Sequence, residues 1–65
     1  MMTKDAEFIL ATLERNHGMM EFTDKSTPEE INEVFNMSKA AFKRGIGSLY
    51  KEKKIILHQD RIEKV

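Results

Sequence analysis

Hydrophobic residues recur at helical spacing along three stretches of the chain. The first stretch follows the i, i+3, i+4, i+7 spacing of a helix that buries one face, at Ala6, Ile9, Leu10 and Leu13. Thr3 or Asp5 can cap the start of this helix. We expect it to end near Asn16, because Gly18 can adopt the left-handed conformation that follows many helices.

The second stretch opens with the strongest local signal in the sequence. Thr27 fits the N-cap, Pro28 the first helical position, and Glu30 the third position of a capping box. Ser26 and Glu29 form the same box one residue earlier, so both starting points stay open. We expect a helix from residue 28 to about residue 35 that turns three apolar side chains inward: Ile31, Val34 and Phe35.

The third stretch predicts a helix that begins after the N-cap Ser38 and ends in a basic cluster. Phe42, Ile46 and Leu49 fall at i, i+4 and i+7 and form its core face, with Tyr50 on the border. The opposite face, called the basic face below, holds only cationic or small residues: Ala40, Lys43, Arg44, Gly47, Ser48 and Lys51.

Two glycines interrupt this helix, and a glycine inside a helix costs ~1 kcal/mol relative to alanine. Gly45 lies beside the core face, where its expected role is to let another helix pack closely. Gly47 lies on the basic face, where no core contact needs it. It either marks the close approach of a ligand or is merely tolerated, and both interpretations stay open.

Short apolar runs predict three strands around these helices. The runs cover residues 19–22, 55–57 and 61–65. Only Asn36 and Met37 separate the second helix from the third, so these two helices form a helix-turn-helix. The order helix, strand, helix, helix, strand, strand predicts an α+β, mostly α, winged helix-turn-helix, with three helices and a small antiparallel sheet. The hairpin of the last two strands is the wing.

The predicted core lies between the three helices, and the small sheet closes one side of it. It contains eight apolar residues: Leu10, Leu13, Ile31, Val34, Phe35, Phe42, Ile46 and Leu49. Phe8 does not fit the stripe of the first helix. It either packs against the C-terminal hairpin or docks onto a neighbour.

Length and composition limit the number of domains, the kinds of site and the location of the protein. A chain of 65 residues makes one domain, and it contains no cysteine for a disulfide or a thiolate metal site. No apolar run approaches the ~18 residues of a membrane span, and the N-terminus lacks a signal-peptide pattern. We therefore expect a soluble cytoplasmic protein of modest stability without a membrane partner.

The charge of the chain is zero overall but segregated along it. Residues 1–37 carry three Lys or Arg against eight Asp or Glu, a formal charge of −5, and residues 38–65 carry eight against three, a charge of +5. Such asymmetry is typical of a polyanion-binding face, although exposed lysines are often simply solvated. The candidate phosphate contacts are Lys39, Lys43, Arg44, Lys51, Lys53 and Lys54.

Base readout by this surface is expected to be poor. The basic face offers no Asn or Gln and no aromatic ring for stacking. The wing tip, residues 58–61, contains one cation and one acid and so is no basic finger. The predicted affinity is therefore salt-dependent and largely independent of base sequence.

Catalytic chemistry is not indicated. The chain has no cysteine nucleophile and no glycine-rich phosphate loop, and His17 and His58 stand alone in the sequence. Ser26 and Ser38 are explained as helix caps. We expect neither an enzyme nor a metal, cofactor or small-molecule substrate.

Three segments carry a resemblance to a known family: DKSTPEEI (24–31), MSKAAFK (37–43) and IGSLYK (46–51). Over residues 8–62 the chain resembles the C-terminal winged-helix domain of the conserved virulence factor B family. In these bacterial proteins several S1-type RNA-binding barrels precede the winged helix. The resemblance implies RNA binding, RNA rather than duplex DNA, and regulation of gene expression, including virulence factors, by full-length proteins. The S1-type domains are then partners of this one.

A single winged-helix domain covering residues 1–65, excised from a larger multi-domain protein, is the expected organisation, and the tandem Met1 and Met2 suggest an added start codon. A second functional hypothesis stays open. In it the domain docks onto neighbouring domains or a partner protein without touching nucleic acid. Phe8 and the acidic face of the first two helices would then form the contact surface.

Overall fold

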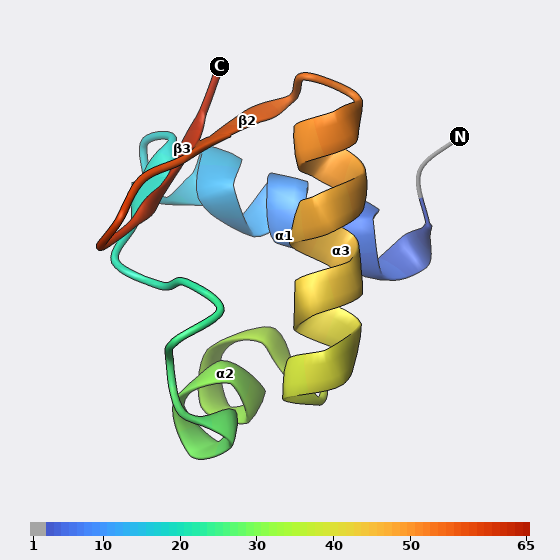
Figure 1. The fold of residues 1–65 in the computed structure, drawn as a ribbon, viewed down its shortest axis with the longest axis vertical. Coiled ribbons are helices and arrows are strands. Elements are labelled where there is room, and N and C mark those ends of the chain that lie inside the picture. Colours follow the sequence, from blue (N-terminus) through green and yellow to red (C-terminus); the bar gives the residue numbers. More distant parts are fainter. Residues whose placement is uncertain (1–2) are drawn as a thin grey trace.

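The fold is a winged helix, described for residues 3–65 by a computed structural model (Figure 1). The predicted order of elements is confirmed: α1 (Lys4–Arg15), β1 (Met19–Met20), α2 (Pro28–Phe35), α3 (Lys39–Lys51), β2 (Ile55–Leu57) and β3 (Ile62–Lys64). Met1 and Met2, which suggested an added start codon, lie outside the described residues.

Side-chain caps fix the start of each helix. At α2 the Thr27 hydroxyl accepts from the Glu30 N–H at 3.2 Å and donates to the Glu30 carboxylate at 3.0 Å. Ser26 does not cap α2, because its hydroxyl accepts from the Thr23 N–H at 3.0 Å. Helix α2 therefore begins with the capping box of Thr27 and Glu30. The other helices begin in the same way, at Thr3 and Ser38.

Residues in the left-handed region end the helices. His17, Asn36 and Lys53 have φ values of 61°, 53° and 61°, and Gly18 has 85°, as predicted for that glycine. After α3 the Lys53 N–H donates to the Tyr50 carbonyl at 3.0 Å. The Lys54 N–H reaches the Leu49 carbonyl at 2.8 Å, which completes a Schellman motif.

Replacing Lys53 with glycine should stabilise the domain. A side chain with positive φ costs about 1–2 kcal/mol, and glycine removes this cost at a smaller loss of backbone entropy. We expect Lys53→Gly to raise the free energy of unfolding by about 1 kcal/mol, which is a rise in Tm of several degrees. Thermal unfolding followed by circular dichroism measures it. Lys54→Gly is the matched control, and it should lower the Tm; a fall for both variants would contradict the argument.

The three strands form one antiparallel sheet in the order β1-β3-β2. Ile62 pairs with both Met20 and Leu57 across the sheet, and the His58 N–H donates to the Arg61 carbonyl at 2.9 Å to close the hairpin. The first strand is shorter than the predicted run 19–22, because Phe22 leaves the sheet and packs against the helices.

An aromatic cluster lies at the centre of the core. The Phe35 ring meets the Phe22 ring edge-on, with centroids 5.4 Å apart, and lies 4.9 Å from the Phe42 ring. The buried core extends beyond the predicted set, since Ala6, Ile9, Ile55 and Ile62 also belong to it. Of the predicted residues, Leu10 is only partly buried.

The prediction that Val34 points inward is wrong, because its side chain is 39% exposed. Helix α2 is short and is anchored by Ile31 and Phe35, which are 0% and 1% exposed and lie one turn apart. Val34 falls to the side of this pair, where its side chain is only partly covered.

The prediction for Gly45 is confirmed. A Cβ atom placed on this buried residue would lie 2.5 Å from Cδ1 of Ile9 and 3.5 Å from the backbone nitrogen of Ala6. Helix α1 therefore crosses α3 at a distance that excludes any larger residue unless Ile9 moves.

Candidate nucleic-acid interface

The basic face of α3 is turned away from the core. Lys43, Arg44, Gly47 and Lys51 are exposed, whereas Lys39, in the first turn of the helix, is partly buried. Among residues 3–65 none of the cations on this face forms an ion pair, so their charges are available to a ligand. Figure 1 shows α3 crossing α1, with the wing beside the C-terminal half of α3.

An aromatic side chain accompanies the basic face, contrary to the sequence-based prediction. Tyr50 is 58% exposed and follows Lys43 and Gly47 at i+7 and i+3. It lies on the border of the core face, one residue from the end of α3, where its side chain stays open to solvent. A ring at this position can stack on a base, so the surface is better suited to single-stranded nucleic acid than the sequence indicated.

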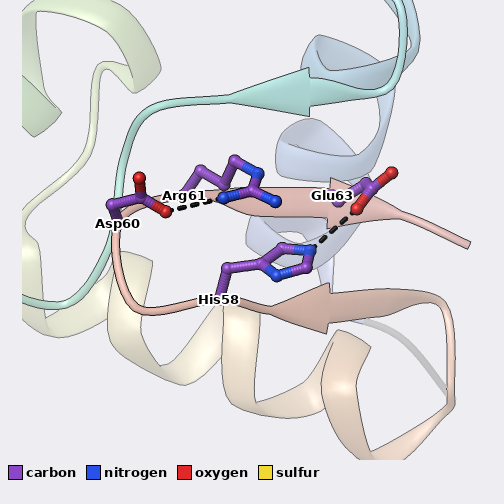
Figure 2. Close-up of polar contacts among 4 residues, drawn as sticks. All are labelled: His58, Asp60, Arg61 and Glu63. Carbon is purple, nitrogen blue, oxygen red and sulfur yellow. Dashed lines mark hydrogen bonds and ion pairs between the residues drawn. The ribbon is translucent and has the colours of Figure 1, made fainter.

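Among residues 3–65 the cations of the wing are all paired, so the wing contributes polar pairs and no free cation (Figure 2). Nε2 of His58 lies 2.7 Å from Oε1 of Glu63, and NH1 of Arg61 lies 2.8 Å from Oδ1 of Asp60. The expectation that the wing tip is no basic finger agrees with this pairing. The prediction that His58 stands alone is wrong, because the hairpin places Glu63 diagonally across from it.

Lys53 and Lys54 lie apart from the other candidates. They sit in the turn between α3 and β2, at the opposite end of the hairpin from the wing tip (Figure 1). Sequence reasoning missed Lys64, which joins them, because only the strand register brings it there; its Nζ lies 3.4 Å from Oε2 of Glu14. These three lysines line a surface depression together with Leu10, Glu14 and Val65.

The six predicted cations therefore form two groups. Lys43, Arg44 and Lys51 share the exposed side of α3, with Lys39 at its start, and the pair Lys53 and Lys54 extends the charge past its C-terminal end. A helix of 13 residues is about 20 Å long, so a ligand that reaches Lys39 as well as Lys53 must run along α3.

A family model for the CvfB-like winged helix domain matches residues 7–63. The chain belongs to this family. The CvfB-like domain is 52% identical over 54 residues to protein YitL of Bacillus subtilis, an overlap of 83% of this chain and 18% of that protein. It is 50% identical over 58 residues to conserved virulence factor B of Staphylococcus aureus, an overlap of 89% of this chain and 19% of that protein.

A solved structure shares the fold of the CvfB-like domain over its whole length. It is that of a multidomain protein with nucleic acid binding domains from Streptococcus pneumoniae, with a TM-score of 0.95 and 42% identity. The match covers 100% of this chain and 23% of that one. The CvfB-like domain thus spans about a fifth of the length of the proteins that it matches.

The described part of the CvfB-like domain holds neither a metal cluster nor a membrane-spanning helix. Within residues 3–65 no three acidic, histidine or cysteine side chains are grouped so that they could hold a metal ion. No helix in the same range is long and apolar enough to cross a membrane.

Proposed function

We propose that the basic face of α3 binds nucleic acid, RNA in preference to duplex DNA, through the phosphate backbone. The observation that carries this proposal is the row of exposed cations Lys43, Arg44 and Lys51, which have no acidic partner among residues 3–65. Flexible cations on an exposed helix suit phosphate oxygens and give affinity without base sequence. Exposed Tyr50 supports a single strand, since its ring accepts any base.

The wider setting supports the same proposal. The Streptococcus pneumoniae protein that shares the fold is described as having nucleic acid binding domains. We infer that this domain is an accessory module of a larger cytoplasmic regulatory protein, with S1-type domains as its neighbours. In that protein α3 would extend the RNA path of the neighbouring barrels. The role of the domain would be to bind RNA and not to catalyse a reaction.

A titration of the ¹⁵N-labelled domain with a single-stranded RNA and with a DNA duplex tests the proposal. We expect amide shifts to cluster between residues 38 and 54 and to be larger with RNA. Three phosphate contacts predict that log K falls with log salt at a slope of about −2, so affinity drops on the order of tenfold between 50 and 200 mM salt. Absence of shifts with both ligands, at both salt concentrations, would refute the proposal.

Docking without nucleic acid is the second candidate, and one observation favours it. Phe8 is 42% exposed on α1 and lies outside the buried core, as expected for a residue that contacts a neighbour. In the full-length protein Phe8→Ser would then loosen this domain from its neighbours. Unchanged interdomain motion in that variant, measured by NMR relaxation, would count against docking through this residue.

A further inference from the structure

A cavity of about 220 Å³ opens between α3, the wing and the loop that follows β1. It is smaller than the about 300–1,000 Å³ of pockets for drug-sized ligands, so it has room only for a small group. Its apolar floor comes from three elements that are distant in the sequence. These floor residues are Ile46, Leu57 and Ile62.

The floor is a mixture of core and exposed surface. Ile46 and Ile62 are 5% and 0% exposed, so Leu57, which is 42% exposed, offers most of the accessible surface among these three residues. A ring placed on this floor would remove apolar surface from water, which is favourable in proportion to the area covered.

Gly47 keeps the mouth of the cavity open. A Cβ atom added to it would meet no heavy atom within 4 Å, so packing does not require glycine there, in contrast to Gly45. Glycine nevertheless lowers helix stability by ~1 kcal/mol relative to alanine at such a position. An open approach to the cavity is a physical reason for it, and this favours the ligand interpretation over mere tolerance.

The rim carries groups of opposite charge on separate elements. Lys43 lies on the side of α3, and Asp24 lies in the loop, where three hydrogen bonds hold the turn closed between Thr23 and Ser26. His58 completes the rim, and its ring is fixed by the contact of Nε2 with Glu63 (Figure 2). Neither Lys43 nor Asp24 forms an ion pair among residues 3–65.

We propose that this cavity binds one unstacked guanine base of a single-stranded RNA. The carboxylate of Asp24 accepts from N1–H and N2–H of the base, the floor packs on its face, and Lys43 contacts the adjoining phosphate. Guanine is selected because it alone among the four RNA bases presents two adjacent N–H donors on its Watson–Crick edge. The inference rests on the proposed function, since the strand reaches the cavity along the basic face.

Four RNA hexanucleotides test the base preference: an all-uridine strand, and strands in which one central uridine is replaced by guanosine, inosine or adenosine. We expect the guanosine strand to bind about tenfold more tightly than the uridine strand, a change of about 1.4 kcal/mol. Inosine keeps N1–H but lacks the amino group, so its strand should lie between them. The adenosine strand should match uridine. Guanosine monophosphate alone should bind more weakly than the guanosine strand. Equal binding would overturn the claim that the base binds as part of a single strand.

Two variants locate the preference in the cavity. Asp24→Asn should remove the advantage of guanosine while the uridine strand still binds, and Asp60→Asn, which removes the same charge from the wing tip, should keep the advantage. Gly47→Leu should fill the mouth and also abolish the guanosine advantage. Its fold can be checked from the amide spectrum.

The possible failures are distinct. If all four strands bind equally and salt-dependently, the cavity inference is wrong and the proposed function stands. A guanosine advantage that survives Asp24→Asn also overturns it. If no strand binds, the proposed function fails together with the inference.

Discussion

Charge reversal at Lys43 and Arg44 is expected to abolish RNA binding by the isolated domain. Both side chains are exposed and unpaired among residues 3–65, so the double variant Lys43→Glu, Arg44→Glu should fold normally. It replaces two phosphate attractions with two repulsions. We expect affinity to fall by about 100-fold or more, and the salt slope to lose roughly one unit for each lost phosphate contact. Fluorescence anisotropy with a labelled RNA at two salt concentrations measures both quantities.

A matched control separates the site from net charge. Lys4→Glu combined with Arg15→Glu makes the same change in total charge, at exposed positions on α1. This variant should lose much less affinity than the α3 variant, since neither residue belongs to the basic face and exposed charges are screened by salt. Equal losses in both double variants would show that the affinity depends on overall charge and does not come from α3.

Truncation of Phe35 is expected to unfold much of the protein. The side chain is 1% exposed and contacts the rings of Phe22 and Phe42, so Phe35→Ala should cost about 3–5 kcal/mol. At ~0.05–0.15 kcal/mol per residue, a domain of 65 residues has roughly 3–10 kcal/mol of stability in total. Urea unfolding followed by circular dichroism would show a large fall in the midpoint, or no folded baseline at all.

Val34→Ala provides the comparison for Phe35→Ala. The two residues are neighbours on α2, but Val34 is 39% exposed and leaves no buried cavity when shortened. Its variant should lose less than about 1 kcal/mol. A similar loss in both variants would mean that α2 is held by its exposed side, contrary to the packing described above.

Much of the fold could be predicted because its signals are local. The caps at Thr27 and Ser38, the left-handed Gly18 and the close approach at Gly45 each depend on a few adjacent residues and one packing rule. Such signals fix where the helices begin, and the short link between α2 and α3 then fixes the helix-turn-helix.

The predictions that the structure contradicts share a different cause. Whether Val34 is covered, whether Tyr50 is exposed, and whether His58 meets Glu63 depends on which element lies opposite, and periodicity within one helix or strand carries no information on that. The cavity beside Gly47 depends even more on tertiary packing, because its walls come from a loop, a helix and both strands of the wing. The exposed cations of α3 could be named from the sequence, but their division into two groups could not.

The position of β3 has a consequence for how the chain folds. The strand is last in chain order yet lies in the middle of the sheet, paired with β1 on one side and β2 on the other. Until residues 62–64 have left the ribosome, neither outer strand has a partner, and Ile62 is missing from the core. The helices can form earlier, since their contacts are local. The wing, and with it the wall of the cavity, can therefore form only at the end of the domain's synthesis.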